Sequence, residues 1–141
     1  MTIVAPIDSS DRSTDVISGA EDLAEAFDDT IHVVHVLNKS EFVELGRTAA
    51  EDGDAINMEQ IRDVAAEIAA ERVSNLAVPV ETVGLVGDPA SSIVEYAESQ
   101  DARYIVIGGK KRSPVGKAIF GSVTQDVLLN ATCSVVTTIS S

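Results

Sequence analysis

The sequence lacks the features of a disulfide-rich, zinc-binding or membrane protein. Its single cysteine, Cys133, excludes a disulfide within the chain, and no second cluster of His and Cys provides the ligands of a zinc site. No apolar run approaches the ~20 residues that span a bilayer, and no basic segment of a signal peptide begins the chain. We therefore expect a cytoplasmic protein without a membrane partner.

Basic residues are also scarce. The chain carries 10 Lys and Arg against 23 Asp and Glu, a formal net charge of −13. Such a charge repels phosphate backbones, so we expect no nucleic-acid partner. Four of the ten basic residues nevertheless lie in one stretch, from Gly108 to Ser122, which contains no acidic residue. This local excess of positive charge predicts an anion-binding loop.

Apolar runs typical of strands alternate with segments of helical periodicity. This order predicts one domain over residues 1–141, a three-layer α/β sandwich in which right-handed crossovers join parallel strands. Within it, Asp88 is expected to cap a helix whose first residue is Pro89. The predicted strands are 2–7, 31–37, 80–86, 103–107 and 134–139; the predicted helices lie within 16–27, about 54–76, 89–97 and 122–130; and 38–53 is predicted to be a loop.

The stretch from Gly108 to Ser122 does not contain either of the common phosphate-loop motifs. GxGxxG is absent from the chain, and Gly116-Lys117 lacks both the preceding glycine and the following Ser or Thr of a Walker A loop. Glycines that let backbone N–H groups turn around an anion before a helix N-terminus remain consistent with the sequence. The residues that fit this arrangement are Gly108, Gly109, Gly116, Gly121 and Ser122.

Ser122 has a second interpretation. Ser122-Val123-Thr124-Gln125 matches the capping box S-x-x-Q, which satisfies helix N–H groups without any ligand. Capping and phosphate contact are compatible, and the sequence leaves both open.

These segments together resemble the universal stress protein family along essentially the whole chain. The similar pieces are IVAPIDSSD, HVVHVLN, GDPASSIVEYA and YIVIGGKKRSPVGKAIFGSVTQDVLLNATCSVVTTI, in the family's order and spacing. The resemblance implies a five-stranded parallel sheet with strand order 3-2-1-4-5, usually in a homodimer. It also implies ATP as ligand, alone or with Mg²⁺, bound by the pattern G-x-x-G-x₉-G-[ST].

This pattern begins here at Gly108 and ends at Gly121-Ser122, but its middle glycine is replaced by Lys111. With ordinary torsions, Lys111 could offer its ammonium group to the phosphates while Gly109 supplies the tight turn. The other nucleotide-binding positions that the resemblance implies are Pro6, Asp8, Ser9, Val36 (through its backbone) and Val123.

We favour binding over catalysis, because no residue of the loop has the context of an activated general base. Asp8 could contact ribose or base, hold a divalent ion through water, or cap the first helix. His32 and His35 lie three apart on one strand, so they face opposite sides, and His35 is expected to be a core residue. The hypotheses are an ATP-binding regulatory module in stress response, a slow ATPase or phosphotransferase, and a dimerisation module that binds no nucleotide. An exposed edge strand at 134–139 predicts a homodimer.

Overall fold

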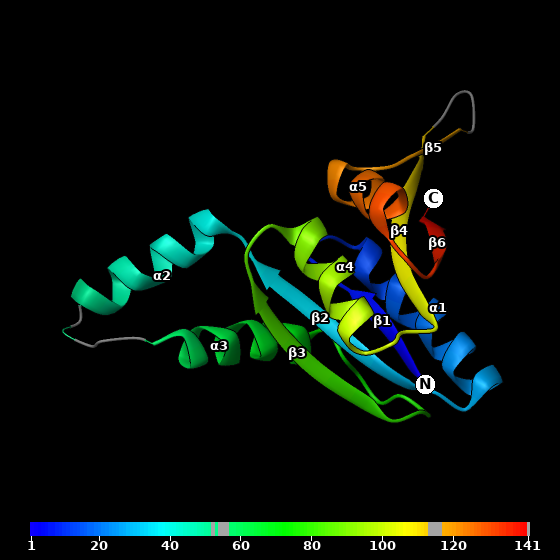
Figure 1. Ribbon diagram of the computed structural model, residues 1–141, viewed down its shortest axis with the longest axis horizontal. Helices are drawn as coiled ribbons and strands as arrows, with labels where there is room; N and C mark the ends of the chain where they lie inside the picture. Colours follow the sequence, from blue (N-terminus) through cyan, green and yellow to red (C-terminus); the bar gives the residue numbers. More distant parts are fainter. Residues whose placement is uncertain (52, 54–56, 113–116, 141) are drawn as a thin grey trace.

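A parallel sheet forms the centre of the computed structural model, which describes residues 1–51, 53, 57–112 and 117–140 (Figure 1). Its strands are β1 (Thr2–Pro6), β2 (Thr30–Leu37), β3 (Val80–Val86), β4 (Tyr104–Arg112) and β6 (Ser134–Ser140). The sheet order β3-β2-β1-β4, with β6 parallel to β4 on the far side, confirms the predicted order 3-2-1-4-5. A short strand, β5 (Lys117–Ile119), pairs antiparallel with the end of β4.

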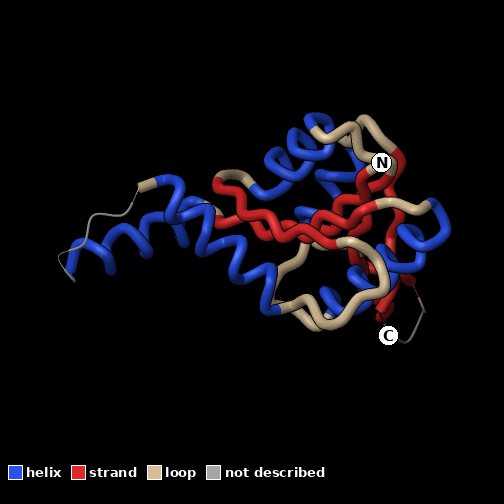
Figure 2. Tube along the Cα trace, turned by 90° about the horizontal axis from the view of Figure 1, so that it is seen from below, coloured by secondary structure: helices blue, strands red, loops and turns tan. Residues whose placement is uncertain are grey.

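Helices cover both faces of this sheet, which confirms the three-layer architecture. Helices α1 (Arg12–Phe27) and α3 (Met58–Glu71) pack on one face, and α4 (Pro89–Ser99) and α5 (Ser122–Asn130) pack on the other. Helix α2 (Lys39–Glu51) follows β2 and extends, beside part of α3, away from the sheet (Figures 1 and 2). No helix within the described ranges has the length and apolar character required to cross a bilayer.

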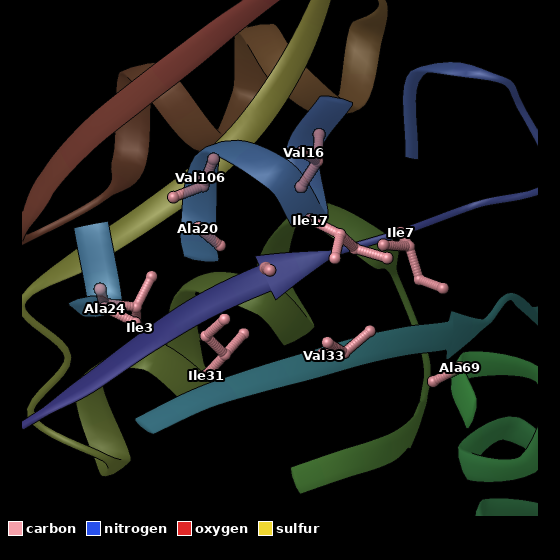
Figure 3. Close-up of a cluster of buried hydrophobic side chains, with 11 residues drawn as sticks. Ile3, Ile7, Val16, Ile17, Ala20, Ala24, Ile31, Val33, Ala69 and Val106 are labelled. Atoms are coloured by element: carbon pink, nitrogen blue, oxygen red, sulfur yellow. The ribbon is translucent and has the colours of Figure 1, made fainter. Parts of the chain in front are cut away.

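The core is divided by the sheet into two main clusters of apolar side chains. On the face of α1, the side chains of Val16, Ile17, Ala20 and Ala24 pack against β1 and β2 (Figure 3). Their spacing is the helical period that the sequence shows. On the other face, Ala90, Ile93 and Ala97 of α4 and Val127 of α5 pack against Val4, Val34, Ile105 and Ile107. Burial on both faces explains why the central strands read as nearly continuous apolar runs.

The loop predicted over residues 38–53 is wrong, because residues 39–51 form α2. A capping box starts this helix: the Asn38 side chain accepts the Glu41 backbone N–H at 2.9 Å, and the Glu41 carboxylate accepts the Asn38 N–H at 3.2 Å. Only Phe42 and Leu45 pack against the core, and no residue of α2 is buried. The prediction of a loop rested on the polar and acidic composition of this segment, which is compatible with a helix that buries none of its residues.

The predicted glycine loop is also shorter than expected. Strand β4 continues past Ile107 to Arg112, and Lys110 to Arg112 pair with Ile119 to Lys117 of β5. Glycines and charged residues suggested a loop, whereas the backbone continues in a hairpin that extends beyond the sheet (Figure 1). The predicted helix over about 54–76 is described as α3 from Met58 to Glu71; the region 54–56 lies outside the described residues.

Asp29 joins the beginnings of three strands at one edge of the sheet. Its side chain is 1% exposed and accepts hydrogen bonds from the Met1 ammonium group at 3.0 Å and from Arg103 Nε at 2.7 Å. The hydrogen bond from Arg103 is the main reason that the pKa of Asp29 lies below its usual value, so the carboxylate is ionised at neutral pH. This cluster therefore fixes the amino ends of β1, β2 and β4.

Gly84 permits the close packing of α3 on β3, which generates a first prediction. A Cβ atom at Gly84 would lie 1.9 Å from the backbone oxygen of Arg62 and 2.6 Å from the Ala66 nitrogen. Backbone cannot yield as a flexible side chain does, so we expect Gly84→Ala to lower the free energy of unfolding by roughly 3 kcal/mol. Urea denaturation followed by circular dichroism measures this loss.

Gly46→Ala is the matched control. It adds the same methyl group to α2, where no atom lies within 4 Å of the new Cβ. We expect it to raise stability by about 0.5–1 kcal/mol, because alanine favours a helix over glycine. Equal denaturation midpoints for the Gly84 variant and the wild type would contradict the described packing of α3 against β3.

Candidate functional site

Strand β1 ends before its neighbours, which opens the sheet at the carboxyl ends of its strands. Its last pair with β2 is Pro6 with Val34, whereas β2 continues to Leu37 and β4 to Arg112. The Val34 oxygen accepts the Ile7 N–H, and the Leu37 oxygen accepts the Gly87 N–H on the opposite side. In a parallel strand, the backbone N–H and C=O groups of successive residues point alternately toward the strand on one side and the strand on the other. Val34 faces β1, so Val36 faces the same side, where β1 has already ended.

A cavity of about 650 Å³ occupies this edge. It lies where the strand order reverses, because the connection from β1 leads to β2 on one side while β4 lies on the other. Segments that are far apart in the sequence form its wall: Pro6–Ser10, Arg12, Ser13, Val16, Val34–Val36, Asn38, Glu41, Ile68, Glu71, Arg72, Pro89, Ile93, Ile107, Gly108 and Gly121–Thr124.

Eight of the eleven positions predicted from the sequence line this one cavity. They are Pro6, Asp8, Ser9, Val36, Gly108, Gly121, Ser122 and Val123. They come from the end of β1, the end of β2, β4 and the beginning of α5, so the fold brings together residues as distant as Pro6 and Val123.

The other three positions are placed differently. Gly109 lies within β4 opposite Ile139, and a Cβ there would come within 2.5 Å of the Phe120 ring. Gly109 thus makes room for Phe120, and the predicted tight turn at this residue is wrong. The backbone of Lys111 pairs with Ala118, which gives it the ordinary extended torsions considered from the sequence. Its phosphate contact stays a prediction, and Gly116 lies outside the described residues.

Asp8 is held at the cavity wall by a network of hydroxyl groups. Its Oδ1 accepts the Ser10 backbone N–H at 2.8 Å and the Ser10 hydroxyl at 2.5 Å. The buried Ser13 hydroxyl donates to the Asp8 backbone oxygen at 2.9 Å and accepts the Asp8 N–H at 3.1 Å. Oδ2 lies 3.9 Å from Arg12 Nη2. Oδ1 of Asp8 is therefore held by Ser10, whereas Oδ2 has only the more distant contact with Arg12.

The ionisation of Asp8 reflects a balance between these contacts. Burial is the largest influence and opposes the charged form, but the two hydrogen bonds from Ser10 and the positive charge of Arg12 together exceed it. The pKa of Asp8 consequently lies below its usual value. At neutral pH the cavity wall presents a carboxylate that only accepts hydrogen bonds.

The capping box predicted at Ser122 is not formed. The N-cap of α5 is Gly121, whose oxygen accepts the Gln125 N–H at 3.0 Å, and the Gln125 side chain donates to the Phe120 oxygen at 2.8 Å. Ser122 is instead the first residue of the helix. Because the first N–H groups of a helix have no acceptor within it, the N–H groups of Ser122 to Thr124 are available at the cavity together with the Ser122 hydroxyl. The Thr124 hydroxyl, which donates to the Gly108 oxygen at 3.1 Å, fixes α5 to β4.

Sequence reasoning missed two arginines in this wall. Arg72, at the end of α3, donates from Nη2 to the Ser9 oxygen at 2.9 Å, and Arg12, the first residue of α1, lies four positions after Asp8. The spacing of Asp8 and Arg12 could have indicated their proximity. The contact of Arg72 spans 63 positions and has no local signal.

A second hollow of about 550 Å³ adjoins the first. Ser9, Ser10 and Arg12 line both, and Lys110 lines the second together with Asp11, Asp15 and Ser140. Of the basic residues predicted to attract an anion, Lys110 therefore lies beside the main cavity rather than in it.

The two histidines lie on opposite faces of the sheet, as predicted. His32 contacts the Tyr96 hydroxyl at 2.6 Å through Nδ1 and the Glu81 carboxylate at 2.9 Å through Nε2. His35 is buried on the side of α1 and α3 and reaches the cavity. No group of three or more His, Cys, Asp or Glu side chains within the described residues could hold a metal ion.

Comparisons with known proteins agree with this architecture. The chain is 34% identical over 137 residues to universal stress protein MJ0531 of Methanocaldococcus jannaschii, covering 94% of this chain and 78% of that protein. A universal stress protein structure from Archaeoglobus fulgidus is 36% identical, with 97% of each chain covered and a TM-score of 0.65. Another from the same organism, solved in complex with dAMP, is 28% identical, with 97% and 96% covered and a TM-score of 0.61.

The family model described as "Universal stress protein family" matches residues 1–138, almost the full length of the chain. Together with the relative at 34% identity, this match settles the family that the sequence suggested. The chain belongs to the universal stress protein family.

Proposed function

We propose that this protein is an ATP-binding regulatory module of the stress response. The observation that carries the proposal is the cavity of about 650 Å³ at the switch point, which combines a backbone edge, an ionised carboxylate and a helix N-terminus. Its volume of about 650 Å³ falls within the range of roughly 300–1,000 Å³ that is usual for small-molecule sites. A similar universal stress protein was solved in complex with dAMP, which supports a nucleotide as the ligand.

The adenine base is assigned to the end of β2. There the N–H and C=O of Val36 face the space left by β1, and Pro6 supplies apolar surface beside them. One donor and one acceptor on the same residue match the ring nitrogen and the amino group at the edge of adenine. This pairing is the basis for choosing an adenine nucleotide.

The ribose is assigned to the wall formed by the loop after β1. Ionised Asp8 can accept hydrogen bonds from sugar hydroxyl groups, and Ser9 lies next to it. Ser13 and Arg72 hold this loop in place from α1 and α3, so the carboxylate is positioned before a ligand arrives. A fixed site loses less conformational entropy on binding than a loop that must first be ordered.

The phosphates are assigned to the beginning of α5. Three backbone N–H groups and the Ser122 hydroxyl meet at the positive end of the helix dipole, an arrangement that favours anions. Even a Cβ atom at Gly121 would have no neighbouring atom within 4 Å, so the approach to these groups is open. Mg²⁺ would accompany ATP through its phosphates and, by way of water, Asp8.

Binding fits this site better than turnover. A carboxylate whose pKa lies below its usual value is a weak general base, because it holds a proton poorly at neutral pH. We therefore assign regulation to the nucleotide-bound state in the cytoplasm, where it alters self-association or partner choice. Phosphate release that is lost in Asp8→Ala would instead favour a slow ATPase.

Nucleotide binding has a direct test. The chain has no Trp and two Tyr, so nucleotide released from the purified protein dominates its absorbance near 260 nm. For protein freed of ligand, we expect ATP at 100 times its dissociation constant to add about 2.7 kcal/mol of stability, measured as a rise in melting temperature.

Inorganic tripolyphosphate is the control for this experiment. A basic loop that attracts any polyanion would respond to it as strongly as to ATP, whereas a site that also binds base and ribose responds to ATP alone at the same concentration. The proposal is overturned if no nucleotide is released and ATP leaves the melting temperature unchanged.

Ser122→Ala tests the phosphate assignment. The change keeps the helix and removes one hydroxyl donor, so we expect affinity for AMP and ATP to fall about fivefold while affinity for adenosine stays the same. Isothermal titration calorimetry measures both. Ser18→Ala, which removes an exposed hydroxyl from α1 outside the cavity, should change neither. An equal loss of affinity for adenosine would contradict the assignment of the phosphates to the beginning of α5.

We also propose a homodimer formed through β6. This strand pairs with β4 on one side, and Ile139 on it remains 44% exposed. An unpaired β-branched edge favours pairing with a second copy.

We expect light scattering to give twice the 14.8 kDa chain mass, and Ile139→Lys to give a monomer. Leu129→Lys places the same charge on α5 at a side chain that is 81% exposed, and should stay dimeric. A monomeric wild type would refute this assembly.

A further inference from the structure

One residue of the cavity wall, His35, has a buried side-chain nitrogen without a partner in the protein. Within the described part of the chain, two buried side-chain atoms lack a hydrogen bond: His35 Nε2 and Thr138 Oγ1. Only His35 lines the cavity, and its side chain is 9% exposed. A buried polar group without a partner is costly, so such an atom beside a cavity indicates a group that the ligand or water completes.

The other ring nitrogen determines the chemistry of this atom. Nδ1 lies 3.3 Å from the backbone oxygen of Ile7, which can only accept a hydrogen bond. Nδ1 therefore carries the proton, and in the neutral ring Nε2 has a lone pair. For the neutral ring, the ligand group that completes Nε2 is therefore a hydrogen-bond donor.

The surroundings of His35 indicate which donor this is. On the same face of the sheet, Val16 of α1 and Ile68 of α3 add apolar surface to the cavity wall. His35 also immediately precedes Val36, whose backbone faces the vacated space at the end of β2. Apolar walls beside a backbone edge suit a flat base more than a sugar or phosphate, and the only donor on adenine is its exocyclic amino group.

We infer that His35 Nε2 accepts a hydrogen bond from the exocyclic amino group of the bound adenine, which makes His35 a specificity-determining residue. The inference rests on the nucleotide-binding function proposed above. It assigns a role to a side chain that the sequence suggested was a core histidine.

Two substitutions separate the nitrogens of His35. His35→Asn places an amide near the position of Nδ1, where it can still donate to Ile7, and leaves nothing at Nε2. His35→Gln reaches the position of Nε2 with an amide oxygen, a replacement acceptor. His32→Asn is the matched control, because it alters the other buried histidine, which does not line the cavity.

The measurement compares AMP with purine riboside 5′-monophosphate, which lacks the amino group, and with dAMP, which lacks the 2′-hydroxyl. We expect the preference of the wild type for AMP over purine riboside monophosphate to shrink about fivefold in His35→Asn. It should be largely retained in His35→Gln and unchanged in His32→Asn. The ratio of AMP to dAMP affinity should be the same in every variant.

A readout on the wild type does not depend on how the variants fold. The ¹⁵N chemical shift of His35 Nε2 should move on addition of AMP and stay in place with purine riboside monophosphate. An unchanged preference, an equal loss for all three ligands or a static ¹⁵N shift would each overturn the inference. A changed ratio of AMP to dAMP affinity would indicate that His35 contacts the ribose, and would overturn the assignment to the amino group. Failure of the wild type to bind any nucleotide would refute both this inference and the proposed function, whereas normal AMP binding without the His35 effect would refute this inference alone.

Discussion

The end of β1 at Pro6, before β2 and β4 end, is the constraint on which the site depends. Two parallel strands that continue past a shorter one leave a gap in the middle of the sheet, with the backbone of Val36 on one side and Gly108 on the other. The chain leaving β1 must turn there, and Ser13 and Arg72 fix that turn from different helices. The cavity is therefore a consequence of strand length and connection order, and its polar residues lie at the ends of strands or the beginnings of helices.

The fold was largely predictable because its core elements carry their own local signals. Apolar runs marked the strands, a 3.6-residue period marked α1, and Asp88 caps α4 as expected through its bond to Ser91 N–H at 3.0 Å. The failures have one physical cause. Helix α2 contains no buried residue and β5 is exposed along its length, so their polar composition was interpreted as a loop. The capping box of α2 and the backbone pairing of β4 with β5 stabilise these segments, and neither interaction produces a strong pattern of apolar residues in the sequence.

The residues of the cavity wall were predictable where a polar residue directly follows a strand or begins a helix. Asp8 follows β1 and Ser122 begins α5, and a role for each could be proposed from the residues around them. Arg72 and His35 could not, because one is defined by a contact across 63 positions and the other by a nitrogen left without a partner. Both features exist only once three helices and the sheet have come together. A histidine in an apolar strand reads as core, and here it is buried and also part of the cavity wall.

The corrected cap of α5 bears on how an acidic protein can attract an anion. With a net charge of −13, the overall field opposes a nucleotide, and Asp8, Glu41 and Glu71 stand in the cavity wall itself. Long-range attraction therefore cannot supply the affinity, and short-range donors must. Had Ser122 capped α5, its hydroxyl and one helix N–H would already be satisfied. Because Gly121 is the cap and has no side chain, these donors stay available, and their fixed positions can select a phosphate group by geometry rather than by charge.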